Sequence, residues 1–122
     1  MKILVPSQGE DIISKIDNHF AKAKHFIFMD TDKDVWEIFE NEFIHEKHSG
    51  DKIANKAKDL KIDTFIVKNI GPHAFDILTN QGIKIFYYEK GSIKDAISKL
   101  KKNELSQMFK ANKKHGAILG ED

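Results

Sequence analysis

The strongest constraint on the fold of this chain is the alternation of strand-like and helix-like patterns across residues 63–101. Two short apolar runs, "FIV" at 65–67 and "IKIFYY" at 83–88, have the β-branched and aromatic composition that is typical of strands. A stripe of apolar residues at helical spacing follows each run. Alternating strands and helices predict parallel strands with right-handed crossovers, and continuous apolar strands predict burial on both faces.

The boundaries of these two helices can be predicted from local signals. Gly71 and Pro72 open the first helix, since proline at the first helical position loses only an N–H that has no partner within the helix. Gly82 ends it. Ser92 and Asp95 have the spacing of a capping box at the start of the second helix. Its apolar stripe consists of Ile93, Ala96, Ile97 and Leu100.

The first half of the chain adds strands at 3–5, 25–30 and 35–43. The last two flank the polar turn "TDKD" at 31–34 and therefore form a hairpin. A helix follows, with residues 49–51 as cap candidates. Its apolar stripe is Ile53, Ala54, Ala57 and Leu60. This order predicts an α/β fold, a three-layer α/β/α sandwich of the ribonuclease H-like kind with a five-stranded mixed sheet.

The periodic patterns fade after residue 101, which divides the chain into a domain and a tail. We expect one domain over residues 1–102 and a weakly structured C-terminal tail over 103–122. Leu105, Met108 and Phe109 are expected to add a helical turn or two at the start of the tail. Residues 111–122 are expected to be more mobile than the core, because they lack apolar periodicity and contain two glycines.

Composition excludes several functional classes. The 122 residues include no cysteine, so neither a disulfide nor an iron–sulfur cluster held by the chain's own thiolates is possible. Twenty basic against nineteen acidic residues give no argument for a nucleic-acid partner. No apolar run approaches the length of a membrane span, and residues 3–5 are too few for the apolar region of a signal peptide. We therefore expect a cytoplasmic protein with no membrane partner.

The stretch "VKNIGPHAF" at 67–75 is a candidate binding site because it joins a strand end, a glycine turn and a helix start. Ligands of open α/β sheets bind beyond the carboxyl ends of parallel strands, and a helix N-terminus attracts anions. Lys68 and Asn69 offer further donors, and Gly71 lets a ligand approach the backbone closely. The alternative is that this stretch is only an efficient turn. It lacks both GxGxxG and P-loop spacing, so no nucleotide is predicted.

The six histidines offer metal ligands but no recognisable metal motif. His45 and His48 lie in a polar loop, where a histidine is more often solvated than bound to a metal. His25 lies in a predicted strand and fits a position at the sheet's edge. Catalytic residues are not predicted: a two-metal nuclease needs clustered carboxylates on its central strands, whereas the strand at 63–69 ends in lysine and asparagine.

Three longer stretches can be compared with known families: "MKILVPSQGEDIISKIDNHFAKAKHFIF", "NEFIHEKHSG" and "IVKNIGPHAFDILTNQGIKIF". Together they resemble the dinitrogenase iron–molybdenum cofactor-binding family, which includes NifX, NafY and the C-terminal part of NifB. The resemblance covers residues 1 to 100 in order and spacing. Ala21 departs from it where relatives usually have glycine, and Lys68 stands where they have a small residue.

This resemblance implies a non-enzymatic carrier of an anionic metal–sulfur cluster, such as the iron–molybdenum cofactor or another molybdenum–sulfur cluster. It places Asp17, His19 and Phe20 on motif positions. His19 ranks first and His48 second as metal ligands, with His45 third and His73 and His25 lower. Asn69, Gly71 and Lys68 complete the implied cofactor-binding set.

Asp17 is expected to orient a neighbour rather than to touch the cluster, and Lys22 to add positive charge. Cluster-assembly or redox proteins are the implied partners. The runner-up hypothesis is a non-catalytic interaction module that docks on an iron–sulfur or redox partner without binding metal. A third hypothesis is zinc or iron binding by the histidines alone.

Overall fold

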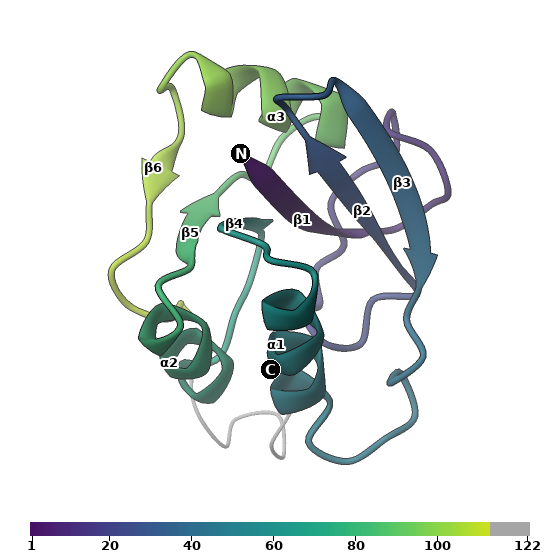
Figure 1. The fold of residues 1–122 in the computed structure, drawn as a ribbon, viewed down its shortest axis with the longest axis vertical. Coiled ribbons are helices and arrows are strands. Elements are labelled where there is room, and N and C mark those ends of the chain that lie inside the picture. Colours follow the sequence, from purple (N-terminus) through teal and green to yellow (C-terminus); the bar gives the residue numbers. More distant parts are fainter. Residues whose placement is uncertain (113–122) are drawn as a thin grey trace.

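The computed structural model describes residues 1–112, which form one six-stranded mixed sheet with three helices (Figure 1). The strands follow the order β3-β2-β1-β4-β5-β6. The elements are β1 (Lys2–Ser7), β2 (His25–Asp30), β3 (Val35–Glu40), α1 (Ser49–Asp59), β4 (Thr64–Val67), α2 (Pro72–Asn80), β5 (Lys84–Tyr87), α3 (Ile93–Lys101) and β6 (Ser106–Gln107). β1, β4 and β5 are mutually parallel, and the other neighbouring pairs are antiparallel.

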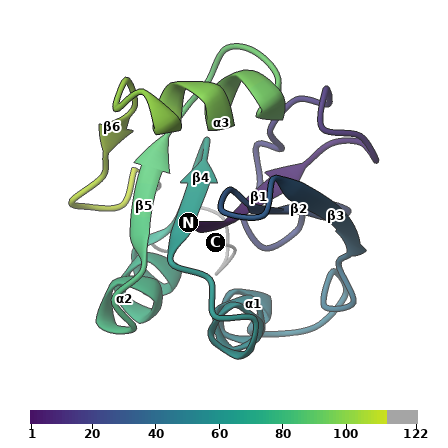
Figure 2. The same cartoon turned by 45° about the horizontal axis from the view of Figure 1, so that its top comes forward.

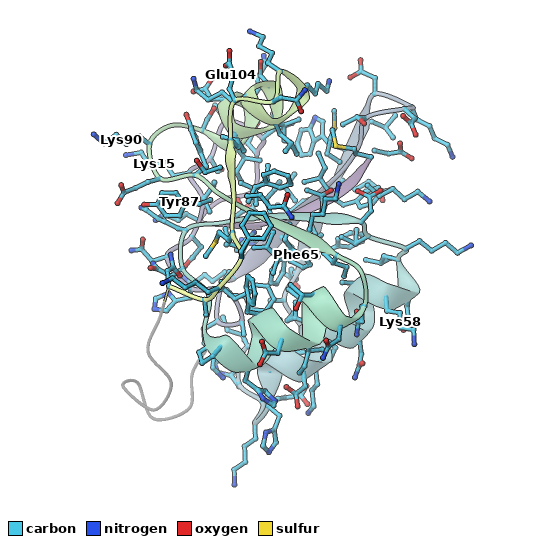
Figure 3. All side chains as sticks on the ribbon, turned by 90° about the vertical axis from the view of Figure 1, so that its left-hand side faces the viewer. Lys15, Lys58, Phe65, Tyr87, Lys90 and Glu104 are labelled. Carbon is cyan, nitrogen blue, oxygen red and sulfur yellow. The ribbon has the colours of Figure 1, made fainter. Side chains whose placement is uncertain are left out.

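Helices cover both faces of this sheet, α1 and α2 on one side and α3 on the other (Figure 2). Phe20 and Phe65 are fully buried on the α1–α2 side, where their rings pack with centroids 5.3 Å apart. Ile27 and Ile66 are fully buried on the α3 side. Figure 3 shows Phe65 inside the molecule, whereas Lys58, Lys90 and Glu104 point to the surface. The predicted three layers, with helices on both faces of a mixed sheet, are therefore present.

The predicted boundaries of the last two helices are confirmed. Gly71 is the N-cap of α2 with Pro72 at its start, and Gly82 follows the end of the helix with φ of 81°. Ser92 and Asp95 form the capping box of α3. The start of α1 differs from the cap candidates, because its N-cap is His48, in the left-handed conformation with φ of 56°.

The strand count of five was wrong. The sixth strand, β6, pairs antiparallel with β5 through Phe86–Gln107 and Tyr87–Ser106. It comes from the segment where we expected a helical turn, and the strand forms because the open edge of β5 supplies backbone partners. Met108 continues along this edge, its N–H donating to the Ile85 carbonyl at 2.7 Å.

Burial of the two parallel segments also differs from the prediction in part. All four residues of β4 are buried, as expected for a central strand. In β5, Lys84 is exposed and Phe86 is only half-buried. The reason is that β5 lies one strand from the sheet's edge, and the two-residue β6 covers little of it.

The predicted mobility of residues 111–122 falls almost entirely outside the described residues. Within residues 1–112, no helix is both long and apolar enough to cross a bilayer.

Candidate functional site

The candidate site lies at the edge of the sheet where the parallel strands end. α1 precedes β4 and α2 follows it, so both helices begin at this edge. His73 Nε2 lies 2.9 Å from Asp51 Oδ1, and this contact joins the first turns of the two helices. This edge therefore gathers two helix N-termini, whose free N–H groups and partial positive charge favour an anion.

Neither of these helix N-termini has a side-chain cap. Gly71 has no side chain, and the side chain of His48 makes no capping hydrogen bond. The backbone of Gly71 is extended, with φ of −79° and ψ of 165°, which any residue can adopt. A glycine is thus not required here for its backbone conformation.

The clearest side-chain geometry at this edge joins Asp17 and His19. Asp17 Oδ1 accepts a hydrogen bond from the His19 backbone N–H at 2.8 Å and lies 3.1 Å from His19 Nδ1. The His19 side chain is 52% exposed, whereas the Asp17 side chain is 17% exposed. A carboxylate at Nδ1 favours the tautomer with its proton there, which leaves the Nε2 lone pair available to a metal.

Three contacts fix the position of this Asp17–His19 segment on the sheet. The Asp17 N–H donates to the Pro6 carbonyl at 2.9 Å, at the end of β1. Asn69 Nδ2, just beyond β4, donates to the Asn18 carbonyl at 3.1 Å. Phe20 anchors the segment in the core. The structure therefore brings the segment that carries His19 beside Asn69, although His19 and Asn69 are 50 residues apart in the chain.

The loop with His45 and His48 is tied to the same segment by Asn41 and Lys22. The buried Asn41 amide donates to the carbonyls of Ala21 and Ala23, both at 2.8 Å, and accepts from the Phe43 N–H at 2.9 Å. Lys22 Nζ donates to the carbonyls of Ile44 and Glu46 at 3.3 and 3.2 Å. Lys22 thus holds the loop, a role that its sequence position did not indicate.

The histidines themselves do not form a preformed cluster. His45 and His48 are exposed, and no hydrogen bond or ion pair in the described part joins them to His19, Asn69 or Gly71. No group of three or more histidine, aspartate or glutamate side chains within residues 1–112 is arranged to hold a metal ion. His25 does not lie on an edge strand, because β2 pairs on both sides; its Nε2 lies 3.7 Å from Glu10 Oε1.

Lys68 and its neighbours are held by a residue that sequence reasoning missed. Asn112 Nδ2 donates to the Lys68 carbonyl at 3.0 Å, and Asn112 Oδ1 accepts from the Ile70 N–H at 2.9 Å. Among residues 1–112, no carboxylate pairs with the half-buried Lys68 side chain. Asn112 lies in a Lys-rich tail without a pattern, so no sequence signal identified it.

One tyrosine near this edge has a perturbed acidity. Partial burial, together with the nearby Glu89 carboxylate, raises the pKa of Tyr87 above its ordinary value of 10.0. Its phenol therefore stays protonated at neutral pH and adds no charge to the end of β5.

A model of the dinitrogenase iron–molybdenum cofactor family matches residues 1–103. The chain belongs to this family. The match covers every element through α3 and confirms the family that the sequence resembles. A comparison with curated proteins gives no match.

Solved structures share the fold. The apo form of the orange protein from Desulfovibrio gigas superposes with a TM-score of 0.86 at 22% identity, over 92% of this chain and 96% of that one. A Thermotoga protein assigned to NifB superposes with a TM-score of 0.78 at 27% identity, over 92% of this chain and 98% of that one. A Methanocaldococcus jannaschii protein assigned as a dinitrogenase superposes with a TM-score of 0.66 at 21% identity, over 90% of this chain and 96% of that one.

Proposed function

We propose that this protein is a cytoplasmic carrier of an anionic metal–sulfur cluster, of the iron–molybdenum cofactor kind or another molybdenum–sulfur cluster. Membership of the dinitrogenase iron–molybdenum cofactor family supports a role connected with such a cluster. The observation that carries the proposal is the Asp17–His19 pair at the sheet's carboxyl edge, where an exposed imidazole is oriented by a carboxylate and its segment is bound by Asn69.

The electrostatics of this edge suit an anionic cargo. Both helix N-termini present N–H groups without a side-chain cap. The first turn of α2 has no acidic residue, and the one acidic residue in the first turn of α1, Asp51, contacts His73. Lys68 and Lys22 add positive charge, although the Lys22 ammonium is already bound to two carbonyls. Asn69 Nδ2 and the Gly71 turn add further donors. Because the chain has no cysteine, metal ligation falls to imidazole nitrogen.

We assign the ligands in an order that follows their geometry. His19 ranks first, since the Asp17 carboxylate orients it and a carboxylate behind a ligating histidine strengthens its binding. His48 ranks second because it lies at the N-cap of α1, and His45 third. Both are exposed, so a cluster bound to His19 could recruit them by a shift of the loop. Metal binding would then move the loop that carries His45 and His48 toward His19, because the three histidines are not already grouped around one position.

The test is metal analysis of protein produced with and without a supply of the cluster. The proposal predicts molybdenum and iron that co-purify with the protein only when the cluster is supplied, and that are lost with His19→Ala. The competing hypothesis is a module that docks on an iron–sulfur or redox partner and binds no metal itself. It predicts metal-free protein in both preparations and retention on the immobilised partner.

We also propose that the domain is a carrier and not a catalyst, on a fold of the ribonuclease H-like kind. Two-metal hydrolysis of a nucleic acid needs carboxylates at the ends of the central strands. Here β4 leads into Lys68 and Asn69 instead. We expect no metal-dependent cleavage of an RNA–DNA hybrid. Cleavage that disappears when Asp17 or Asp63 is replaced by asparagine would overturn this proposal.

A further inference from the structure

The strand β3 closes one side of the sheet and has an unprotected edge. β3 pairs only with β2 within residues 1–112, through six consecutive pairs from Asp30–Val35 to His25–Glu40. Proteins usually guard such edges with short strands, lysine, proline or a bulge. β3 has six residues with no lysine, proline or bulge, and its only charged side chains are Glu37 and Glu40; the strand at the opposite edge, β6, has only two residues. The free backbone groups of β3 are therefore available to another strand.

The same strand carries exposed apolar side chains. Val35, Trp36 and Ile38 are 48%, 39% and 36% exposed, and they are three of the six large hydrophobic residues exposed in the described part of the chain. Trp36 and Ile38 pair with Met29 and Ile27, which face α3. A groove beside them is lined by Ile12, Met29, Asp34, Trp36, Lys94, Ile97, Ser98 and Lys101. α3 thus leaves this end of the sheet's face open.

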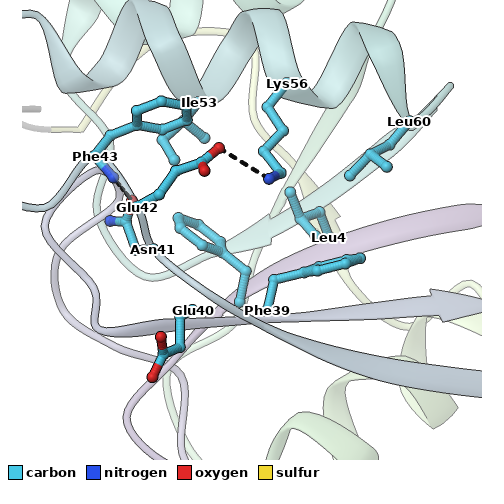
Figure 4. A pocket seen from close by; sticks show the side chains of 10 residues that line it. Leu4, Phe39, Glu40, Asn41, Glu42, Phe43, Ile53, Lys56 and Leu60 are labelled. Atoms are coloured by element: carbon cyan, nitrogen blue, oxygen red, sulfur yellow. Dashed lines mark hydrogen bonds and ion pairs between the residues drawn. The ribbon is translucent and has the colours of Figure 1, made fainter.

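The opposite face of β3 is covered only at Phe39, since Val35 and Glu37 are exposed. Phe39 packs toward α1, with Lys56 Nζ 5.7 Å from its ring centroid. Lys56 also pairs with Glu42 at 3.1 Å across the crevice between β3 and α1 (Figure 4). Any partner of β3 is therefore expected at the free edge and on the face that carries Trp36 and Ile38.

We propose that β3 pairs antiparallel with β3 of a second copy of this chain, with Ile38 at the two-fold axis. Two antiparallel copies of one strand in a continuous sheet are related by a two-fold axis normal to the sheet. Each residue then pairs with a residue of the other copy whose side chain lies on the same face of the sheet. Two registers place the axis near the middle of β3, one at Glu37 and one at Ile38. Centring on Glu37 would oppose two glutamates, which is destabilising. Centring on Ile38 opposes two isoleucines.

The register centred on Ile38 is also complementary at its flanks. Trp36 of one copy lies opposite Glu40 of the other, and Glu37 opposite Phe39, so no like charges face each other. The groove beside Trp36 carries Lys94 and Lys101, which suits the approach of the partner's Glu40. This charge pattern favours a second copy over an unrelated peptide. The continuous sheet would then have twelve strands, six from each copy.

The mass of the protein in solution tests the pairing. Light scattering over a concentration series should approach twice the 14.0 kDa chain mass. Ile38→Lys should return the protein to monomer, because two lysines would face each other at the axis. Phe109→Lys, which changes an exposed aromatic residue outside β3, should leave the dimer intact. A wild type that is monomeric at every concentration, or a dimer unaffected by Ile38→Lys, would overturn the proposal.

Because the chain has no cysteine, a single introduced cysteine can report by crosslinking which residues of the two copies of β3 lie opposite each other. Ile38→Cys should form a disulfide-linked dimer on mild oxidation, because directly opposed strand residues lie within disulfide reach. Glu37→Cys and Trp36→Cys are the matched controls. In this register the two copies of residue 37 would be about 8 Å apart, too far for a disulfide. Crosslinking of Glu37→Cys in preference to Ile38→Cys would contradict the register, and equal crosslinking of all three variants would indicate random collision instead of a dimer.

Discussion

Asp17 Oδ1 lies 3.1 Å from His19 Nδ1 while it also accepts the His19 backbone N–H at 2.8 Å. One carboxylate oxygen therefore holds both the backbone and the ring of the same histidine. The ring is left half-exposed with Nε2 free of any hydrogen bond in the described part of the chain. This relationship orients a surface histidine, and the proposal that His19 is a metal ligand can be tested by substitution and by pH.

Asp17→Asn should weaken cluster binding by about 10- to 100-fold, the usual effect of removing a carboxylate behind a ligating histidine. The asparagine keeps the size of the side chain but removes the charge that favours the proton on Nδ1. Titration of the metal-free variant with the cluster measures the affinity. In a His19→Ala background the same substitution should have little further effect, and an equal loss in both backgrounds would show that Asp17 does not act through His19.

Cluster binding should weaken in acid and recover on return to neutral pH. A protonated imidazole has no lone pair to offer a metal, so protons and metal compete for His19. Affinities measured at a series of pH values give the dependence, and circular dichroism at each pH confirms that the fold persists. Binding that is unchanged across the range in which imidazoles titrate would argue against histidine ligation.

Asn41→Ala should lower the free energy of unfolding by about 2–4 kcal/mol, because it leaves two buried carbonyls and one N–H without partners. Urea unfolding measures the change. Asn55→Ala, on the exposed face of α1, is the matched control and should stay within about 0.5 kcal/mol of wild type. If Asn41→Ala matched the control, the amide would not be what holds the His45–His48 loop to the 21–24 segment.

The order of the elements could be predicted from sequence because it depends on local patterns. Pro72 and the Ser92–Asp95 box mark helix starts through backbone chemistry that needs no distant partner. β6 could not be predicted, since Ser106 and Gln107 become a strand only through pairing with β5, far along the chain. The start of α1 at His48 was missed because a left-handed histidine is a rare cap.

The candidate site was predictable to a lesser extent, for the same physical reason. Asp17 and His19 are two residues apart, so their contact is local and follows from the sequence. The contact of Asn69 with the Asn18 carbonyl agrees with the expectation that the two segments adjoin at the carboxyl edge. The hydrogen bonds to distant carbonyls from Asn41, Lys22 and Asn112 depend on tertiary packing, and no spacing in the sequence predicts them.

The most direct test of cluster carriage at His19 is titration of metal-free protein with isolated iron–molybdenum cofactor, followed by visible absorption. Wild type should bind it, His19→Ala should bind about tenfold or more weakly, and Gly71→Val should also bind weakly because its side chain obstructs the start of α2. Asn18→Ala, which leaves the carbonyl bound by Asn69 in place, should bind like wild type. Failure of wild type to bind would contradict the carrier function, and equal binding by wild type and His19→Ala would contradict this placement of the site.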